Sequence, residues 1–301
     1  MRISVIIPTY RRADFLDRAV KSVLSQDYQD VEVVVVDDNG PDSPDRAAAA
    51  EKLAAIQDDR VVFVQPEVHL GGGGARNRGI DAATGDYITF LDDDDIYLPG
   101  KLSHQAAFME RGFEMSFMDV YMRDAAGVDR ERLTHALSED PGTEALFREH
   151  MLRHLTPTAG YMFTREALQS LGGFPNAPSA QEFILMLTAI LKPLRIGYLK
   201  EALVAQYRHA GERISTGPGK IRGENRLFAL KKQHFSGLNG KDRRSIRVRH
   251  YATLFYVYAI QKNWPRALLC GFLSVAISPV AALELWKEKK NITGSETAQE
   301  K

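Results

Sequence analysis

The sequence predicts an α/β fold in which a mostly parallel sheet carries helices on both faces, followed by a helical C-terminal region. Short apolar segments of strand length alternate with segments of helical periodicity between residues 3 and 91. From Lys220 onward only helical patterns remain. The chain has 301 residues, 44% of them hydrophobic, which is enough for one large domain or two ordinary ones. We expect an α/β domain at residues 1–217 and a helical region at 218–301.

The first half of the chain has the clearest strand signals. Ile3–Pro8 and Val31–Val36 show almost no polar alternation, which is typical of strands buried on both faces. Between them, the apolar residues from Leu16 to Leu24 recur on one helical stripe. Strands joined in this way by helices form a parallel sheet. The pattern continues with a helix at 45–56, a strand at 61–64, a flexible glycine loop at 71–74, a helix at 75–83 and a strand at 87–91.

After residue 95 the alternation is less regular. The segment 179–191 is apolar almost all round, so we expect a buried helix there. The other elements expected in this part are strands at 113–122, 158–164 and 202–207, a helix at 142–154, and a turn at 172–175.

Four consecutive carboxylates, Asp92–Asp95, follow the strand at 87–91 directly. Four like charges at the end of a buried strand repel one another unless a positive group neutralises them. A divalent cation is the simplest candidate, because hard oxygen ligands suit Mg²⁺ or Mn²⁺. The alternative is a solvated acidic turn before the helix that Pro99 opens, and this segment alone favours neither interpretation.

Other polar segments follow the neighbouring strands. Thr9–Arg12, Asp37–Asp38 and the glycine loop all lie at predicted carboxyl ends, where parallel sheets bind their ligands. Asp38 could accept a hydrogen bond from a nucleobase or a ribose, or it could belong to a turn-forming Asp-Asn-Gly cluster. The glycine amides could approach a phosphate, and Arg76 and Arg78 favour this interpretation over a merely mobile loop.

Composition and missing motifs exclude several classes of function. The chain has 39 basic and 39 acidic residues, which argues against a general nucleic-acid-binding protein. The single cysteine, Cys270, excludes an internal disulfide and fits a reducing compartment. Because neither G-x-G-x-x-G nor G-x-x-x-x-G-K-[ST] is present, dinucleotide binding and P-loop phosphoryl transfer are disfavoured. The N-terminus leads straight into a strand, so no signal peptide is predicted.

Four sequence blocks together carry a family resemblance. They read SVIIPTYRR, VVVVDDNGPD, GGGGARNRGI and GDYITFLDDDDIYLPGKL. With these blocks the chain resembles, over residues 3–215, the family 2 inverting glycosyltransferases, which use nucleotide sugars and have the GT-A fold. The resemblance implies that the D-x-D motif falls on Asp92, Asp93 and Asp94, with Asp94 binding Mn²⁺ or Mg²⁺ and Asp92 near the ribose or the metal. It also implies that Pro8, Tyr10 and Asp38 hold the nucleoside of a UDP-type donor, and we add Thr9, Arg12, Gly74, Arg76 and Asp93 to the donor site.

The resemblance also implies a catalytic base. The family carries an E-D or Q-D pair at the start of a later helix, and the matching pair here is Gln181-Glu182. Glutamate replaces the usual aspartate, so the carboxylate is one methylene further from the backbone. A capping box in which Ser179 opens the helix and Glu182 reaches back to it is the alternative. We predict that Glu182 is the general base.

The segment Tyr207–Thr216 follows the last predicted strand, and related enzymes carry a similar stretch near the diphosphate. His209 could be a further metal ligand, and Arg208 or Arg213 could hold the leaving diphosphate. The alternative for His209 is an ordinary surface residue.

The C-terminal tail contains an apolar run at Ala267–Leu285 that approaches membrane-spanning length. Pro279 interrupts this run and Glu284 ends it, so we predict packed amphipathic helices with a peripheral membrane contact rather than a span. Basic side chains nearby could meet anionic lipid, or they could form an ordinary solvated surface. The expected location is cytoplasmic, at the inner face of the cytoplasmic membrane.

The predicted reaction transfers a sugar, with inversion, from a nucleoside-diphosphate sugar to a hydroxyl of a carbohydrate or lipid-linked acceptor, in cell-surface polysaccharide or glycolipid synthesis. Two alternatives remain. One is a metal-dependent nucleotidyltransferase, although PTYRRAD lacks the glycines that such an enzyme needs after its first strand. The other is a non-catalytic nucleotide-sugar-binding scaffold, which the replacement at Glu182 keeps open. Release of nucleoside diphosphate, of pyrophosphate or of neither distinguishes the three.

Overall fold

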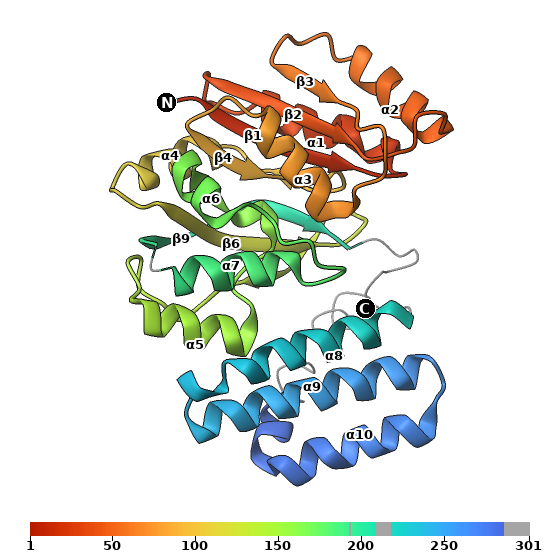
Figure 1. The fold of residues 1–301 in the computed structure, drawn as a ribbon, viewed down its shortest axis with the longest axis vertical. Helices are drawn as coiled ribbons and strands as arrows, with labels where there is room; N and C mark the ends of the chain where they lie inside the picture. The colour runs from red at the N-terminus through yellow and green to blue at the C-terminus, as the bar shows by residue number, and fades with distance from the viewer. Residues whose placement is uncertain (193, 209–217, 286–301) are drawn as a thin grey trace. The chain divides into compact units, whose positions relative to one another are not determined.

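The computed structural model describes residues 1–192, 194–208 and 218–285 (Figure 1). These residues form two compact units. The first unit comprises Met1–Phe147, Leu155–Ala177 and Gln181–Arg208, and it contains the sheet. The second unit joins Arg148–His154 and Pro178–Ala180 to the helices that begin at Pro218.

The first half of the sheet is parallel, as the alternation of strands and helices predicted. Its strands lie in the order β3-β2-β1-β4. The two central strands are almost completely buried, because apolar residues point to both faces and each face is covered by helices. The strands are β1 (Ile3–Thr9), β2 (Val31–Asp37), β3 (Val61–Val64) and β4 (Tyr87–Phe90).

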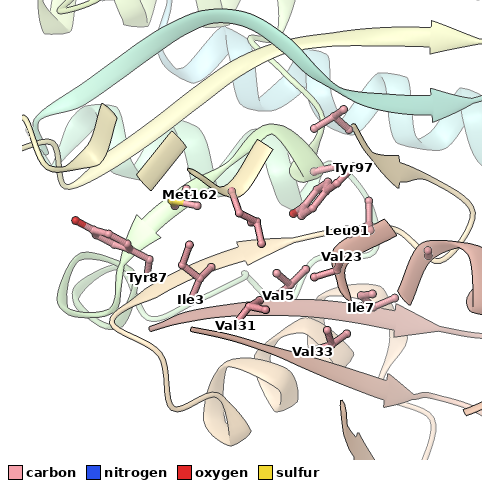
Figure 2. Packing of buried hydrophobic residues seen from close by; sticks show 14 of the residues in the cluster. Ile3, Val5, Ile7, Val23, Val31, Val33, Tyr87, Leu91, Tyr97 and Met162 are labelled. Carbon is pink, nitrogen blue, oxygen red and sulfur yellow. The ribbon is translucent and has the colours of Figure 1, made fainter. Parts of the chain in front are cut away.

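The covering helices divide the core into two layers. On one face, Ile3, Val5 and Ile7 pack with residues of α1 (Ala13–Leu24) and α2 (Pro44–Ala54), as Figure 2 shows for Val23 of α1. On the other face, Ile6 packs with α3 (Gly71–Ala82). Alternate residues of one strand therefore fill opposite layers, as the two-residue period of a strand requires.

The second half of the sheet mixes directions. β8 (Met162–Thr164) is antiparallel to β4 and to β6 (Met115–Arg123), and β9 (Ile196–Tyr207) is parallel to β6. Two strands were not anticipated from the sequence, namely β5 (Ile96–Tyr97), which pairs with β9, and β7 (Asp129–Leu133), which pairs with β6. The helices here are α4 (Lys101–Met109), α5 (Thr143–Arg153), η1 (Thr158–Gly160), α6 (Arg165–Leu171) and α7 (Gln181–Leu191).

The second unit is helical, as predicted. It contains α8 (Pro218–Gln233), η2 (Phe235–Gly237), α9 (Gly240–Ile260) and α10 (Trp264–Ile277). Asn239 and Asn263 cap α9 and α10 through their side-chain oxygens. Arg148 of α5 and Asp242 at the start of α9 form a bidentate ion pair, with both N–O distances 2.8 Å. This ion pair links the two helices.

Within the described part of the chain, no single helix has both the length and the apolar character needed to cross a bilayer. The helices Trp264–Ile277 and Pro279–Leu285 reach that length and character only together, and a bend of 117° separates them.

Candidate active site

Three strands of the parallel half end beside one another, and each is followed by polar residues. The register pairs Thr9 of β1 with Asp37 of β2, and Ile6 of β1 with Phe90 of β4. The acidic run that follows β4 therefore lies next to the end of β1. The contact is direct, since Thr9 Oγ1 donates a hydrogen bond to Asp93 Oδ2 at 2.8 Å. The sequence prediction that these ends form one cluster is thus confirmed in the geometry.

Arg12 neutralises part of the acidic run. Its guanidinium lies 2.9 Å from Asp93 Oδ1 and also donates to a carboxylate oxygen of Asp94. Asp93 is fully buried, and this burial raises the pKa of its carboxyl to about 7, although Arg12 and the Thr9 hydroxyl oppose the shift. Burial acts to lower the pKa of Arg12, but the surrounding carboxylates, Asp93 first, raise it, so Arg12 stays charged.

Two further arginines hold the acidic run from other elements. Arg76 of α3 pairs with Asp92, and both side chains are mostly buried, with exposed fractions of 14% and 26%. Arg18 of α1 donates to the backbone carbonyl of Asp94 at 2.6 Å. The sequence prediction placed Arg76 near a phosphate and did not single out Arg18. The only feature that could have indicated Arg18 is its position on the helix after β1, one turn beyond Asp14.

The buried Asp95 has a structural position and does not cap a helix. Its Oδ1 accepts a hydrogen bond from the backbone N–H of Tyr207 at 2.9 Å. Burial raises the pKa of its carboxyl well above the usual range, and the Asp92 charge adds to the shift. Asp95 therefore ties the end of β9 to the acidic run. Arg208, the residue after the end of β9, pairs instead with Glu131 of β7 at 2.7 Å.

The proposed contacts of His209 and Arg213 lie outside the described residues. For Arg208, the ion pair with Glu131 engages the guanidinium that we assigned to the diphosphate. That assignment therefore requires the ion pair to open when a donor binds.

Asp38 occupies the end of β2 and is only 3% exposed. Its two carboxylate oxygens accept hydrogen bonds from the backbone N–H groups of Leu70 and Gly71, at 2.6 and 2.9 Å. The His69 ring lies 3.0 Å from Asp38 Oδ2 and packs against the Tyr10 ring, with ring centroids 4.5 Å apart. The sequence pattern does not reveal these contacts of His69. Its position just before the glycine segment is the one feature that could have indicated a role in the site.

The glycine segment is not a flexible loop, contrary to the sequence prediction. Gly71–Gly74 form the first turn of α3, and Asp38 holds the start of this helix. A Cβ on Gly73 would lie 2.7 Å from the amide group of the Gln181 side chain, so a larger residue would require that side chain to move. The first four N–H groups of a helix have no partner within it and attract anions. In α3 those of Leu70 and Gly71 bind Asp38, which leaves those of Gly72 and Gly73 for a phosphate, whereas the N–H of Gly74 lies within the helical hydrogen-bond ladder.

Asn77 fastens α3 to the loop that precedes the proposed base. Its Oδ1 accepts from the Phe174 backbone N–H at 2.7 Å, and its Nδ2 donates to the Phe174 carbonyl at 2.9 Å. With Gln181 packed on Gly73, these bonds bring the start of α7 to the edge of the sheet that carries the acidic run. Glu182 follows directly in the first turn of α7, half-buried, and its backbone carbonyl accepts from the Tyr161 hydroxyl at 3.4 Å.

The capping box proposed for α7 is not formed. The helix begins at Gln181, and the residue before it is Ala180, with φ of 60°. Ser179 therefore lies one position before the cap, and its buried hydroxyl has no hydrogen-bond partner among residues 1–192, 194–208 and 218–285. The Glu182 carboxylate is accordingly not needed for this cap.

The carboxylates suit one divalent cation at the acidic run. Asp94 and Asp92 supply hard oxygen donors and are partly exposed, whereas Asp93 is sealed in by Thr9 and Arg12. The Arg12 guanidinium already bridges two of these side chains, which shows that the run holds a positive charge. In the described part of the chain no group of three or more His, Cys, Asp or Glu side chains forms a complete ligand set. A metal here would take its other ligands from the substrate or from water.

The burial of Asp93 predicts a pH dependence of stability in metal-free protein. Because its pKa is raised from 3.8 to about 7 in the folded state, the folded protein keeps a proton that the unfolded chain releases. This stabilisation is fully present below about pH 4 and is lost as the pH rises to about 7. In EDTA, we expect Asp93→Asn to raise the melting temperature by a few degrees at about pH 8, and by clearly less at about pH 5. An equal change at both pH values would contradict this account.

Comparison with known proteins shows the family to which this chain belongs. The family described as "Glycosyl transferase family 2" matches residues 4–172. A Campylobacter jejuni protein described as GalNAc(5)-diNAcBac-PP-undecaprenol beta-1,3-glucosyltransferase is 34% identical over 139 residues. That match covers 46% of this chain and 44% of the relative, so this chain corresponds to less than half of that protein.

Two solved structures share the fold. The crystal structure of S. aureus TarS 1–349 in complex with UDP-GlcNAc has a TM-score of 0.66 at 20% identity, over 93% of this chain and 83% of that one. The mannosyltransferase PcManGT from Pyrobaculum calidifontis, in complex with GDP-Man and Mn²⁺, has a TM-score of 0.61 at 16% identity, over 98% and 82%. The predicted GT-A fold is confirmed. With a family match that spans more than half of its residues and this fold, the chain belongs to glycosyl transferase family 2 and is a GT-A glycosyltransferase.

Proposed function

We propose that the protein transfers a sugar from a nucleoside-diphosphate sugar, of the UDP type, to a hydroxyl of a lipid-linked or free saccharide, with inversion at the anomeric carbon. One observation carries this proposal. One edge of the sheet brings together Asp38, the first turn of α3 and the acidic run Asp92–Asp94. Arg12 and Arg76 form ion pairs with carboxylates of this run. A nucleoside, a diphosphate and a cation can each find its chemical complement there.

The donor would lie along this edge. Asp38, Pro8 and Tyr10 would surround the nucleoside, with the Tyr10 ring as a stacking surface that His69 supports. The diphosphate would lie against the first-turn amides of α3 and Arg76. Asp94, with Asp92, would hold a divalent cation, which stabilises the charge that develops on the leaving diphosphate. The complex of the structurally similar mannosyltransferase contains Mn²⁺, which supports a divalent cation, and we propose Mn²⁺ or Mg²⁺.

Chemistry at the sugar requires one base. In the proposed step the acceptor oxygen attacks the anomeric carbon, and the bond from that carbon to the diphosphate oxygen breaks with its electron pair on the diphosphate. The acceptor proton passes to the Glu182 carboxylate. Because a single displacement reverses the configuration at the carbon, inversion follows. The rigid link from Asn77 to Phe174 positions α7, and so the base, relative to the donor.

The acceptor class is inferred from the chemistry of a relative. The Campylobacter jejuni protein is named for a saccharide joined through a diphosphate to a polyprenol. A lipid-linked saccharide, in polysaccharide or glycolipid synthesis at the cytoplasmic face of a membrane, is therefore the acceptor that we propose. His209 and Arg213 stay assigned to the metal and the diphosphate as a prediction.

The proposal predicts which nucleotide stabilises the protein. With Mn²⁺ present, UDP should raise the melting temperature and ADP should not, because a ligand bound only by the folded state stabilises it. Asp38→Asn removes the charge and keeps an oxygen acceptor for only one of the Leu70 and Gly71 amides, and it should weaken UDP binding by about 10-fold, or 1.4 kcal/mol. Asp42→Asn, an exposed neighbour, is the matched control. Equal UDP binding by the Asp38→Asn and parental proteins would remove Asp38 from the nucleoside site.

A further inference from the structure

The segment from Arg243 to Leu283 has an unusual charge. Its 41 residues contain no Asp or Glu and six basic residues, namely Arg243, Arg244, Arg247, Arg249, Lys262 and Arg266. The whole chain has 39 basic and 39 acidic residues, so this segment carries +6 and the remainder carries −6. The segment contains the α9–α10 hairpin apart from the first three residues of α9, where Lys241 and Asp242 cancel, so the hairpin also carries +6 (Figure 1).

Within the hairpin, α10 packs through its small residues. Its buried positions are Ala267, Cys270 and Ser274. The Ser274 hydroxyl reaches the Val248 carbonyl of α9 at 3.4 Å, and a Cβ on Gly271 would lie 3.2 Å from Phe255. The two helices therefore approach closely through a seam of small side chains.

Most of the large apolar residues of α10 point away from that seam, whereas Leu273 and Ile277 are half-buried. An ordinary surface helix buries its large apolar side chains and exposes polar ones. Here the arrangement is reversed. The large apolar residues along one side of α10 are each 52% to 70% exposed to solvent. These residues of α10 are Trp264, Leu268, Leu269, Phe272 and Val275, and together they form what we call the apolar face.

An apolar face of this size marks a binding surface, because soluble proteins rarely leave such patches in water. The charge of the hairpin decides what binds there. A second copy docked on the same face would bring a second hairpin of +6 against the first, and like charges disfavour that contact. An anionic lipid surface attracts the basic residues and accepts the apolar side chains. Trp264 lies at the start of α10, and tryptophan prefers the boundary between headgroups and acyl chains.

We propose that the α9–α10 hairpin binds the surface of a bilayer that contains anionic phospholipid. The helix α10 lies in the plane of the interface with its apolar face in the acyl region, and the exposed Lys262 and Arg266, which flank Trp264, contact lipid phosphates. Because of the bend of 117° after α10, the two helices do not form one straight segment of membrane-spanning length. This geometry favours a helix that lies in the interface over one that crosses the bilayer. This inference is independent of the proposed reaction, because lipid binding needs neither donor nor base.

The test is sedimentation of the full chain with vesicles, either of phosphatidylcholine alone or with about one third phosphatidylglycerol. We expect the protein to pellet with the anionic vesicles and much less with the neutral ones. The double variant Leu268→Ser with Phe272→Ser should lose at least about 10-fold in partition, since it removes two apolar side chains that are 65% and 70% exposed. The control is Val68→Ser, which changes an apolar residue that is 64% exposed in the first unit and should pellet like the parent.

Two results would overturn the proposal. One is that the parental protein stays in the supernatant with both kinds of vesicle. The other is a concentration-dependent dimer that the double variant abolishes, without any loss of lipid binding, which would assign the apolar face to a second copy. Because the changed residues are exposed, unfolding is not expected, and melting temperatures of the three proteins check this.

Discussion

Glu182→Gln should lower the rate of sugar transfer by about 10²-fold or more, the usual scale for removing a positioned base. Glutamine keeps the size and polarity of the side chain but cannot take the acceptor proton. The backbone carbonyl of Glu182, which accepts from Tyr161, is untouched by the change. Donor binding and melting temperature should therefore stay at parental values. The measurement is acceptor-dependent release of nucleoside diphosphate, beside the melting temperature of each variant.

Two companion variants separate a base from a structural residue. Glu182→Asp keeps a carboxylate and restores the residue that is usual in the family, so it should retain part of the activity. Ser179→Ala removes a buried hydroxyl that has no hydrogen-bond partner in the described part of the chain, and it should leave both transfer and stability unchanged. Transfer at the parental rate by Glu182→Gln would falsify the assignment of the base.

Asp94→Asn should remove most of the metal dependence of donor binding. The parental protein should bind UDP more tightly with Mn²⁺ than in EDTA, and in the variant the two affinities should become equal within about 2-fold. The reason is that an amide oxygen is a much weaker ligand than a carboxylate for a hard divalent ion. Asp94 is 14% exposed and its change leaves Asp93 and Thr9 in contact, so the fold should be retained.

Calorimetric titration of UDP with and without Mn²⁺ measures this effect. Asp59→Asn removes one negative charge from an exposed site outside the acidic run and is the matched control. If Asp94→Asn binds UDP with parental metal dependence, the cation is held elsewhere. A loss of UDP binding in EDTA as well would mean that the variant has damaged the nucleoside site itself.

The parallel half of the sheet could be predicted because its strands are apolar on both faces. Runs such as Val31–Val36 have no polar face to expose, so their burial follows from composition, whereas the strand order β3-β2-β1-β4 was not predicted. The short strands were missed for the opposite reason. β5 has two residues, and β7 reads DRERL, whose pairing with β6 depends on a neighbour rather than on its own apolar pattern.

The glycine segment shows where local propensity fails. Four successive glycines disfavour a helix, and the sequence therefore predicted a loop. The helix forms there because Asp38 binds its first amides and Gln181 packs on Gly73. Both partners lie far away in the sequence, and no local pattern reveals them.

The same limit applies to the candidate site. The acidic run and Asp38 could be placed at strand ends from the sequence pattern, whereas Gln181-Glu182 was assigned only through the family resemblance, and the roles of these residues stay predictions. Their partners could not be predicted, since the contacts of Arg12 with Asp93, of Asn77 with Phe174 and of His69 with Tyr10 arise only from the tertiary fold.

The bridge from Arg12 to Asp93 and Asp94 has a consequence for the order in which ligands bind. On the proposed function, a metal reaching Asp94 does not enter an empty site but exchanges with a guanidinium, so its apparent affinity is reduced by the free energy of that ion pair. A diphosphate offers Arg12 another anion and lowers the cost of the exchange. Metal and nucleotide should then strengthen each other's binding by the same factor, because linkage is reciprocal. Without ligands, Arg12 would neutralise the charge of the acidic run. With ligands, the metal and the donor would bind cooperatively.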